Sequence, residues 1–324
     1  MDTSSSATID LRTNYAPSLV NACEKLLSVK KGGERSKSNA LALLSALCKA
    51  PGGVGGEEEI MSVFQHVQSF LADGDDFAIH RETSSKTLRL EALSLVYAML
   101  ACNNHDPVHI RKGLSTKLLP QLCQAVQEQW YKVIAQALRA LAAVPKFFVV
   151  GFIAEESPEE QKKERDEVAV QLLSAIKPLL AAHDVDQEIK ECALTACAAL
   201  LESLHSNLSS EQTTSMLDLL LARLKNETTR IAAIRTLSII CDTTTPGSSQ
   251  DKIDLTPILA ESIQTMASFL KLQSRSLKQS SLEALDTVIT NSGKSDSDEL
   301  YSKVLEDLSH LVVDSDLHIS NLGL

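Results

Sequence analysis

One stretch of the sequence decides the fold: EQTTSMLDLLLARL at residues 211–224, the polar turn KNE at 225–227, and TTRIAAIRTLSII at 228–240. The first segment carries a broad apolar face, and Ser209 and Ser210 stand before it as N-cap residues. The second segment places its isoleucines and leucine at steps of about three, which makes a single stripe suited to the inner layer of a stack. The stretch therefore predicts two helices joined by a short polar turn.

This pair of helices recurs along the chain. The recurring marker is an Ala-Leu pair, or Thr-Leu in one unit, that begins at residues 40, 92, 137, 193, 236 and 284. The intervals of about 52, 45, 56, 43 and 48 residues bracket the period of roughly 40–47 residues in HEAT and armadillo arrays. Each unit buries its apolar faces only by stacking on its neighbours. We therefore expect an all-α HEAT-repeat α-solenoid, a right-handed superhelix of about seven antiparallel helix pairs.

Strand signals are nearly absent, and the helical patterns fall into consecutive pairs. We expect helices at residues 17–29, 35–49, 57–72, 84–102, 107–127, 128–144, 159–182, 186–205, 211–224, 228–240, 256–272 and 274–291. The one β-like run is Lys146–Ile153, which follows Pro145, and we interpret it as a crossover between repeats. Leu194, Ile234 and Leu285 are expected in the core between adjacent pairs.

The expected domain organisation is a single HEAT-repeat array over residues 1–324, with residues 1–16 disordered. The last residues, LHISNLGL, fall inside the pattern of a second helix whose partner runs from about Asp296 to Val313. Because an array of this kind needs a polar-faced cap at each end, we expect a chain truncated at its C-terminus that lacks further repeats at both ends.

The composition narrows the class of protein. Of 324 residues, 44% are hydrophobic and only 4% aromatic, which suits helix-on-helix packing and disfavours sandwiches and barrels. The formal net charge of −11 disfavours nucleic acid as the main partner. No window approaches the roughly eighteen apolar residues of a membrane span, and the first residues lack the features of a secretory signal. We therefore expect a soluble, intracellular protein without membrane contact. The expected location is the cytoplasm and nucleus.

The sequence gives little support for catalysis, a cofactor or a metal. The glycine-rich run at 52–56 lacks the Lys and Ser/Thr of a phosphate loop, and His105 and His109 have no CxxC partner nearby. His183 beside Asp184 has the composition of a base and its orienting group, but aspartate at a helix turn also serves as a cap. We expect no catalytic, cofactor-binding or metal-binding residue and no small-molecule substrate. The seven cysteines are interpreted as reduced packing residues.

Two groups of residues have the composition of protein-contact sites. The first is a lone Trp beside Tyr and a cation at the entry to a second helix, although this Trp could simply cover the ridge between repeats. The second is a basic cluster around the turn at 225–227, which could pair with partner carboxylates or form a solvated face. The predicted partner contacts are Trp130, Tyr131, Lys132, Arg223, Lys225 and Arg230.

Five segments carry a resemblance to a known family: DVDQEIKECAL at 184–194, RLKNETTRIAAIRTL at 223–237, KIDLTPILAESIQTMASFLK at 252–271, RSLKQSSLEALDTVI at 275–289 and VVDSDLHIS at 312–320. Together they resemble the cullin-associated, neddylation-dissociated proteins, the Cand family, from about Ser84 to the end of the sequence. Before Ser84 the assignment rests on register and periodicity. The matching segments resemble the middle of a longer family member.

The resemblance implies a HEAT-repeat superhelix that wraps around an unmodified cullin and its RING-box subunit. Such a protein competes with the adaptor and substrate receptor, and so promotes receptor exchange among cullin-RING ubiquitin ligases without being an enzyme. Three alternatives share the architecture or the charge: a HEAT-type nuclear transport receptor, which the net charge of −11 permits, a phosphatase or coat scaffold, and an enzyme with titratable groups converging in a pocket.

Overall fold

A computed structural model of the chain describes residues 3–29, 33–50, 57–71, 85–102, 111, 113–150, 157–242, 253–291, 298–309, 311 and 316–322, and structural statements below concern these residues. Among them there is no strand, and the segments outside helices are turns and short connections. The chain divides into two compact units, Met1–Ala175 and Ile176–Leu324. The predicted all-α class is confirmed.

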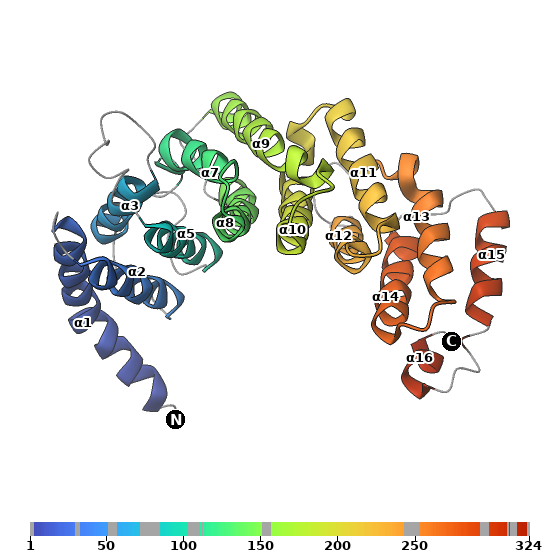
Figure 1. Cartoon of the computed structure of the whole chain (residues 1–324), viewed down its shortest axis with the longest axis horizontal. Helices are drawn as coiled ribbons and strands as arrows, with labels where there is room; N and C mark the ends of the chain where they lie inside the picture. Colours follow the sequence, from blue (N-terminus) through green and yellow to red (C-terminus); the bar gives the residue numbers. More distant parts are fainter. Residues whose placement is uncertain are drawn as a thin grey trace. The chain divides into compact units, whose positions relative to one another are not determined.

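The first unit is a stack of helices in two layers. Its helices are α1 (Thr3–Ser28), α2 (Glu34–Lys49), α3 (Glu57–Leu71), α5 (Lys86–Ala101), the π-helical turn η2 (Leu114–Leu118), α7 (Leu119–Ala125) and α8 (Tyr131–Val150). The second helices α2, α5 and α8 pack in that order along one side, and α3 and α7 cover the other (Figure 1). Helix α1 packs against both α2 and α3.

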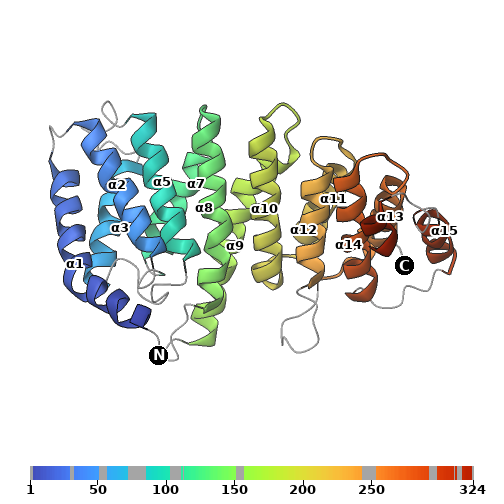
Figure 2. The same ribbon diagram turned by 90° about the horizontal axis from the view of Figure 1, so that it is seen from below.

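The second unit repeats the same arrangement. It comprises the end of α9 (Pro158–Ala181), α10 (Gln187–Leu204), the 3-10 turn η3 (His205–Asn207), α11 (Ser210–Lys225), α12 (Arg230–Asp242), α13 (Thr256–Phe269), α14 (Arg275–Asn291), α15 (Asp298–Ser309) and α16 (Leu317–Leu322). The first helices α11, α13 and α15 pack in series, as do the second helices α10, α12, α14 and α16 (Figure 2). Antiparallel pairs therefore stack as in HEAT and armadillo repeats.

Local capping explains where several helices begin. Ser209 forms a capping box before α11, in which its hydroxyl accepts from the backbone N–H of Gln212 at 3.2 Å, and the Gln212 side chain accepts from the backbone N–H of Ser209 at 2.9 Å. Asp186 caps α10 by accepting from the N–H of Glu188 at 2.9 Å. The polar turns that the sequence placed before these helices thus satisfy their free N–H groups.

The core lies between the two layers of each unit. Leu194, Ile234 and Leu285 are 0%, 1% and 3% exposed, which confirms the prediction that they are core residues. All seven cysteines are free thiols, and five of them are buried. Burial raises the pKa of Cys197 to about 12, so this thiol stays protonated and acts as an apolar packing group.

Successive first helices in the second unit are linked by a repeated ion pair. Lys225 at the end of α11 lies 2.5 Å from Glu261 on α13, and Lys271 after α13 lies 2.7 Å from Asp307 on α15. A third pair joins the second-helix layer, because Arg275 at the start of α14 lies 2.5 Å from Asp316 before α16. These pairs are largely exposed, so each adds little to stability.

The structure differs from one sequence-based expectation. The predicted crossover at Lys146–Ile153 is wrong over Lys146–Val150, because α8 continues through Pro145 to Val150. Residues 151–153 lie outside the described residues. Phe147 and Phe148 are 5% and 0% exposed, and burying two aromatic rings offsets the hydrogen bond that a proline removes from a helix. Helix α1 begins at Thr3, and the expected disorder of residues 1–16 stays a prediction.

Candidate partner-binding surface

The basic cluster of the second unit is built around Arg223, which is a structural residue. Its side chain is 3% exposed, and its guanidinium donates to the carbonyls of Leu180 at 2.7 Å and Ala182 at 2.6 Å. Those carbonyls lie at the end of α9, where a helix has no backbone donors left. Burial also lowers the pKa of Arg223. The donors of Arg223 are directed at the neighbouring helix, and its role as a partner contact stays a prediction.

Lys225 and Arg230 contact groups of their own unit. The ammonium of Lys225 pairs with Glu261, and its side chain remains 49% exposed. The guanidinium of Arg230 lies over the ring of Phe269, 5.0 Å from its centroid. Both residues reach the surface around the turn, and their role as partner contacts remains a prediction.

The turn between α11 and α12 has a geometry that explains its residues. Asn226 accepts from the backbone N–H of Thr228 at 3.0 Å, and the buried hydroxyl of Thr229 donates to the carbonyl of Arg223 at 2.7 Å. This is the side-chain-to-backbone pattern that Asn and Thr supply at turns. These residues of the turn therefore serve the fold, whichever surface groups also serve a partner.

The aromatic group lies in the first unit. Trp130 is half-buried, Tyr131 is 39% exposed, and Lys132 is exposed with its ammonium 5.9 Å from the Tyr131 ring centroid. The structure adds Lys86, whose ammonium lies 5.7 Å from the Trp130 ring centroid. Lys86 was not among the predicted contacts, because it lies 44 residues from Trp130 in the sequence. The available signal was its position at the start of a predicted second helix, because neighbouring second helices bring their starts together.

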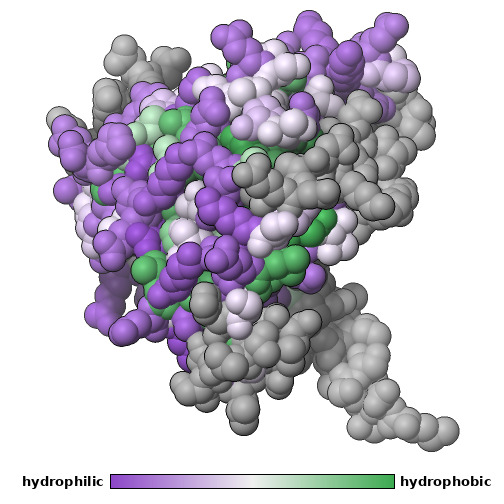
Figure 3. Space-filling model, turned by 90° about the vertical axis from the view of Figure 1, so that its right-hand side faces the viewer, coloured by the Kyte–Doolittle hydropathy of each residue, from purple (hydrophilic) through white to green (hydrophobic). Residues whose placement is uncertain are grey.

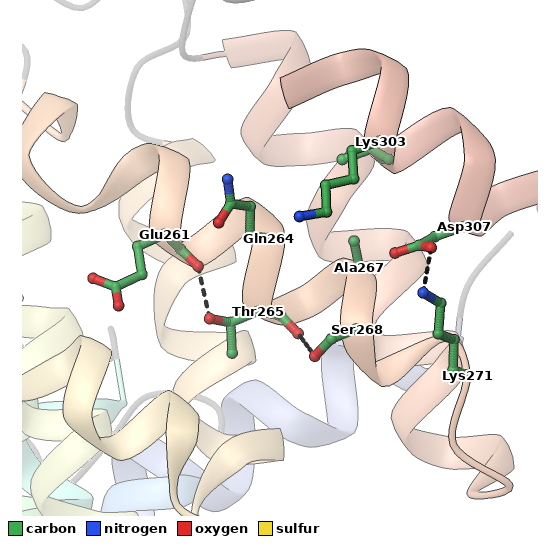
Figure 4. Close-up of a pocket in the computed structure, with 9 residues that line it drawn as sticks. Glu261, Gln264, Thr265, Ala267, Ser268, Lys271, Lys303 and Asp307 are labelled. Carbon is green, nitrogen blue, oxygen red and sulfur yellow. Dashed lines mark hydrogen bonds and ion pairs between the residues drawn. The ribbon is translucent and has the colours of Figure 1, made fainter. Parts of the chain in front are cut away.

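Two open grooves lie in the second unit. One, of about 370 Å³, runs between α13 and α15 and is lined by Glu261, Gln264, Thr265, Ala267, Ser268, Lys271, Lys303, Val304 and Asp307 (Figure 4). The pKa of Lys271 is raised here by its hydrogen bond to Asp307. The other, of about 540 Å³, lies between α12 and α14 and is lined by Ile234, Arg235, Ser238, Ile239, Ser276, Gln279, Ser280, Glu283 and Thr287. Most of the residues that line each groove are polar.

Most polar groups of the α13–α15 groove interact with one another. The Thr265 hydroxyl donates to the carbonyl of Glu261 at 2.7 Å, and the Ser268 hydroxyl donates to the carbonyl of Thr265 at 2.6 Å (Figure 4). The face of the molecule in Figure 3 is mostly hydrophilic, with apolar side chains in small separate patches. Within the described ranges, no three His, Cys, Asp or Glu side chains are grouped as metal ligands would be. No helix searched there has the length and apolar character needed to cross a membrane.

The stacked helix pairs define the chain as a HEAT- or armadillo-type repeat protein. Among solved structures, it is similar to a chain of the Kap95:Nup1 complex, with a TM-score of 0.63 and 12% identity over 99% of this chain and 43% of that one. A designed armadillo repeat protein gives a TM-score of 0.51 and 16% identity, covering 83% of this chain and 100% of the design. At these identities the likeness concerns the fold alone.

Sequence comparison finds relatives along most of the chain. Residues 57–197 match the family described as CAND1-like, TPR repeats. Cullin-associated NEDD8-dissociated protein 1 of Arabidopsis thaliana is 31% identical over 80% of this chain and 20% of its own length, and that of Dictyostelium discoideum is 28% identical over 95% and 22%. The resemblance seen in the sequence is confirmed, and it extends upstream of Ser84. The chain is related to the cullin-associated NEDD8-dissociated proteins over most of its length and spans about a fifth of these relatives.

Proposed function

We propose that this chain is a non-enzymatic scaffold that binds an unneddylated cullin together with its RING-box subunit. In this role it contributes to the exchange of adaptors and substrate receptors on cullin-RING ubiquitin ligases, in the cytoplasm and nucleus. The observation that carries the proposal is the similarity to cullin-associated NEDD8-dissociated protein 1 along 95% of the chain.

The architecture supports this role physically. In each unit the second helices form one layer of a stack, and a stack of repeats presents a continuous series of side chains on which an elongated partner makes many contacts. Many weak contacts of this kind give an interface that a competitor can displace stepwise. The proposed contacts are Trp130, Tyr131, Lys132, Lys225 and Arg230, whereas Arg223 supports the turn that presents the last two.

Binding and exchange are separate proposals for this chain, because it spans only about a fifth of its relatives. Cullin binding needs one complementary surface. Exchange also requires that the bound scaffold and the adaptor compete for the same cullin. A chain that binds without exchanging receptors would support the first proposal and contradict the second.

The test is a pulldown of purified cullin–RING-box complex by the immobilised chain, with unmodified and NEDD8-conjugated cullin in parallel. We expect retention of the unmodified complex and little retention of the conjugated one. Equal capture of both forms, or of neither, would contradict the proposal. Release of a fluorescent adaptor from preassembled ligase then measures exchange in the same preparation.

A further inference from the structure

Charge is distributed unevenly between the layers of the first unit. Its second helices α2, α5 and α8 together carry eight lysines and arginines and only two glutamates, in a chain whose net charge is −11. The facing helix α3 carries three glutamates and no lysine or arginine. The second helices of the other unit, α10, α12, α14 and α16, carry five basic and six acidic residues. The excess of positive charge is therefore specific to α2, α5 and α8.

The exposed residues of these three helices follow stripes. On α2, Arg35, Asn39, Ala42, Ala46 and Lys49 are all exposed, at steps of four, three, four and three. This spacing keeps them on one side of the helix. The stripe has a basic residue at each end and small residues between them.

Helices α5 and α8 continue the pattern. On α5 the exposed residues include Lys86, Tyr97 and Ala101, and on α8 they include Lys132 and Lys146. Because α5 packs between α2 and α8 and is covered behind by α3, its exposed side chains face away from the first-helix layer. We call the exposed residues Arg35, Lys49, Lys86, Tyr97, Lys132 and Lys146 the basic face.

The cations of the basic face are available to a partner. Among the described residues, none of its lysines nor Arg35 lies in an ion pair with an acid. Lys86 and Lys132 are instead held over the rings of Trp130 and Tyr131, which orders an ammonium without neutralising it. By contrast, Arg89 of α5 is already paired with Glu128. The same helices also expose Tyr97, which is 38% exposed, and the small residues Ala42, Ala46 and Ala101.

We propose that the basic face of α2, α5 and α8 docks an acidic surface of a protein partner. The inference rests on the proposed function in that the cullin–RING-box complex is the first partner to be tested, and it names the chemistry of the contact. A protein is favoured over a nucleic acid because a phosphate chain that extended beyond the face would meet an acidic molecule of net charge −11. The alanines and Tyr97 also suit a compact side-chain surface.

The experiment compares three versions of the full-length chain. They are the wild type, the triple variant Lys86→Glu, Lys132→Glu and Lys146→Glu, and a matched control with Lys25→Glu, Lys117→Glu and Lys162→Glu. The control changes three exposed lysines of α1, η2 and α9, so its change in net charge is identical. Far-UV circular dichroism confirms that both variants are folded. Biolayer interferometry measures binding to unmodified cullin–RING-box complex, to poly-L-glutamate and to a single-stranded RNA, at low and physiological salt.

We expect the triple variant to bind the cullin complex and poly-L-glutamate at least about tenfold more weakly, with a smaller salt dependence, and the control to stay within about twofold. Wild-type affinity in the triple variant, or an equal loss in the control, would contradict the proposal that the basic face docks an acidic partner. Either result would leave the proposed function intact. Binding to poly-L-glutamate but not to cullin would support the basic face and reject the proposed function. Tighter binding to RNA than to poly-L-glutamate would overturn the assignment of an acidic protein.

Discussion

At the scale of single residues, Arg223 shows how a charge that looks like a contact residue can belong to the fold. Its two hydrogen bonds, to Leu180 and Ala182, close the end of α9 from a position 41–43 residues away. In a sequence, a basic residue beside a polar turn is expected at the surface. Nothing local indicates that the previous repeat ends beside it with unsatisfied carbonyls.

Replacing Arg223 therefore affects stability more than binding. We expect Arg223→Leu to lower the free energy of unfolding by about 1–3 kcal/mol, because two carbonyls lose their charged donor at a buried site. Urea denaturation measures the change, and Arg235→Leu, which alters an exposed arginine of α12, serves as the matched control at less than about 0.5 kcal/mol. Equal losses of unfolding free energy in the two variants would show that the buried hydrogen bonds of Arg223 contribute nothing to stability.

The buried thiols make stability depend on alkaline pH. Desolvation raises the pKa of Cys48, Cys197 and Cys241 from 9.0 to about 12 in the folded chain. Between these values the unfolded chain releases the thiol protons and the folded chain keeps them, so unfolding becomes easier as pH rises from about 9 towards about 12. The urea midpoint at pH 8 and pH 10 measures the fall. We expect Cys197→Ala to make the urea midpoint fall less steeply with pH. An unchanged dependence on pH would show that the Cys197 thiol does not contribute to it.

At the scale of elements, most helices could be predicted because periodicity and caps agree. The helix predicted at 256–272 corresponds to α13, Thr256–Phe269. The helix predicted at 159–182 corresponds to α9, Pro158–Ala181. The end of α8 could not be predicted, because Pro145 and the following aromatic run indicate a break unless the burial of Phe148 is known. The contact of Lys86 with Trp130 was equally hidden, since it depends on the lateral packing of α5 and α8.

Core truncations should damage the stack locally. Ile234 on α12 is 1% exposed, and we expect Ile234→Ala to cost about 2–5 kcal/mol through a cavity between second helices. In a repeat stack the neighbours of the damaged helix lose protection first, here α10 and α14. Hydrogen exchange followed by mass spectrometry measures this, with Ile239→Ala at a 40% exposed site as the control. Uniform loss of protection throughout both units would contradict a stack coupled between neighbours.

At the scale of the whole molecule, the two units should contribute unequally to binding. The second helices of the first unit have an excess of basic residues, whereas those of the second unit are nearly balanced. In addition, the cations predicted as contacts in the second unit already interact with Glu261 and Phe269. Long-range attraction to an acidic partner therefore originates mainly in the first unit.

Reversing charge in the second unit provides the comparison. The double variant Lys225→Glu and Arg230→Glu places a carboxylate opposite Glu261 and removes the cation from the Phe269 ring, so we expect it to lower thermal stability as well as weaken cullin capture. Its loss of capture should be smaller than that of the triple variant of the basic face, which breaks no internal ion pair but removes the cations from the Trp130 and Tyr131 rings. Pulldown yield and melting temperature, measured on both variants, separate the two effects. If the double variant lost more binding while keeping the wild-type melting temperature, the turn at residues 225–227 rather than the α2–α5–α8 layer would be the principal contact.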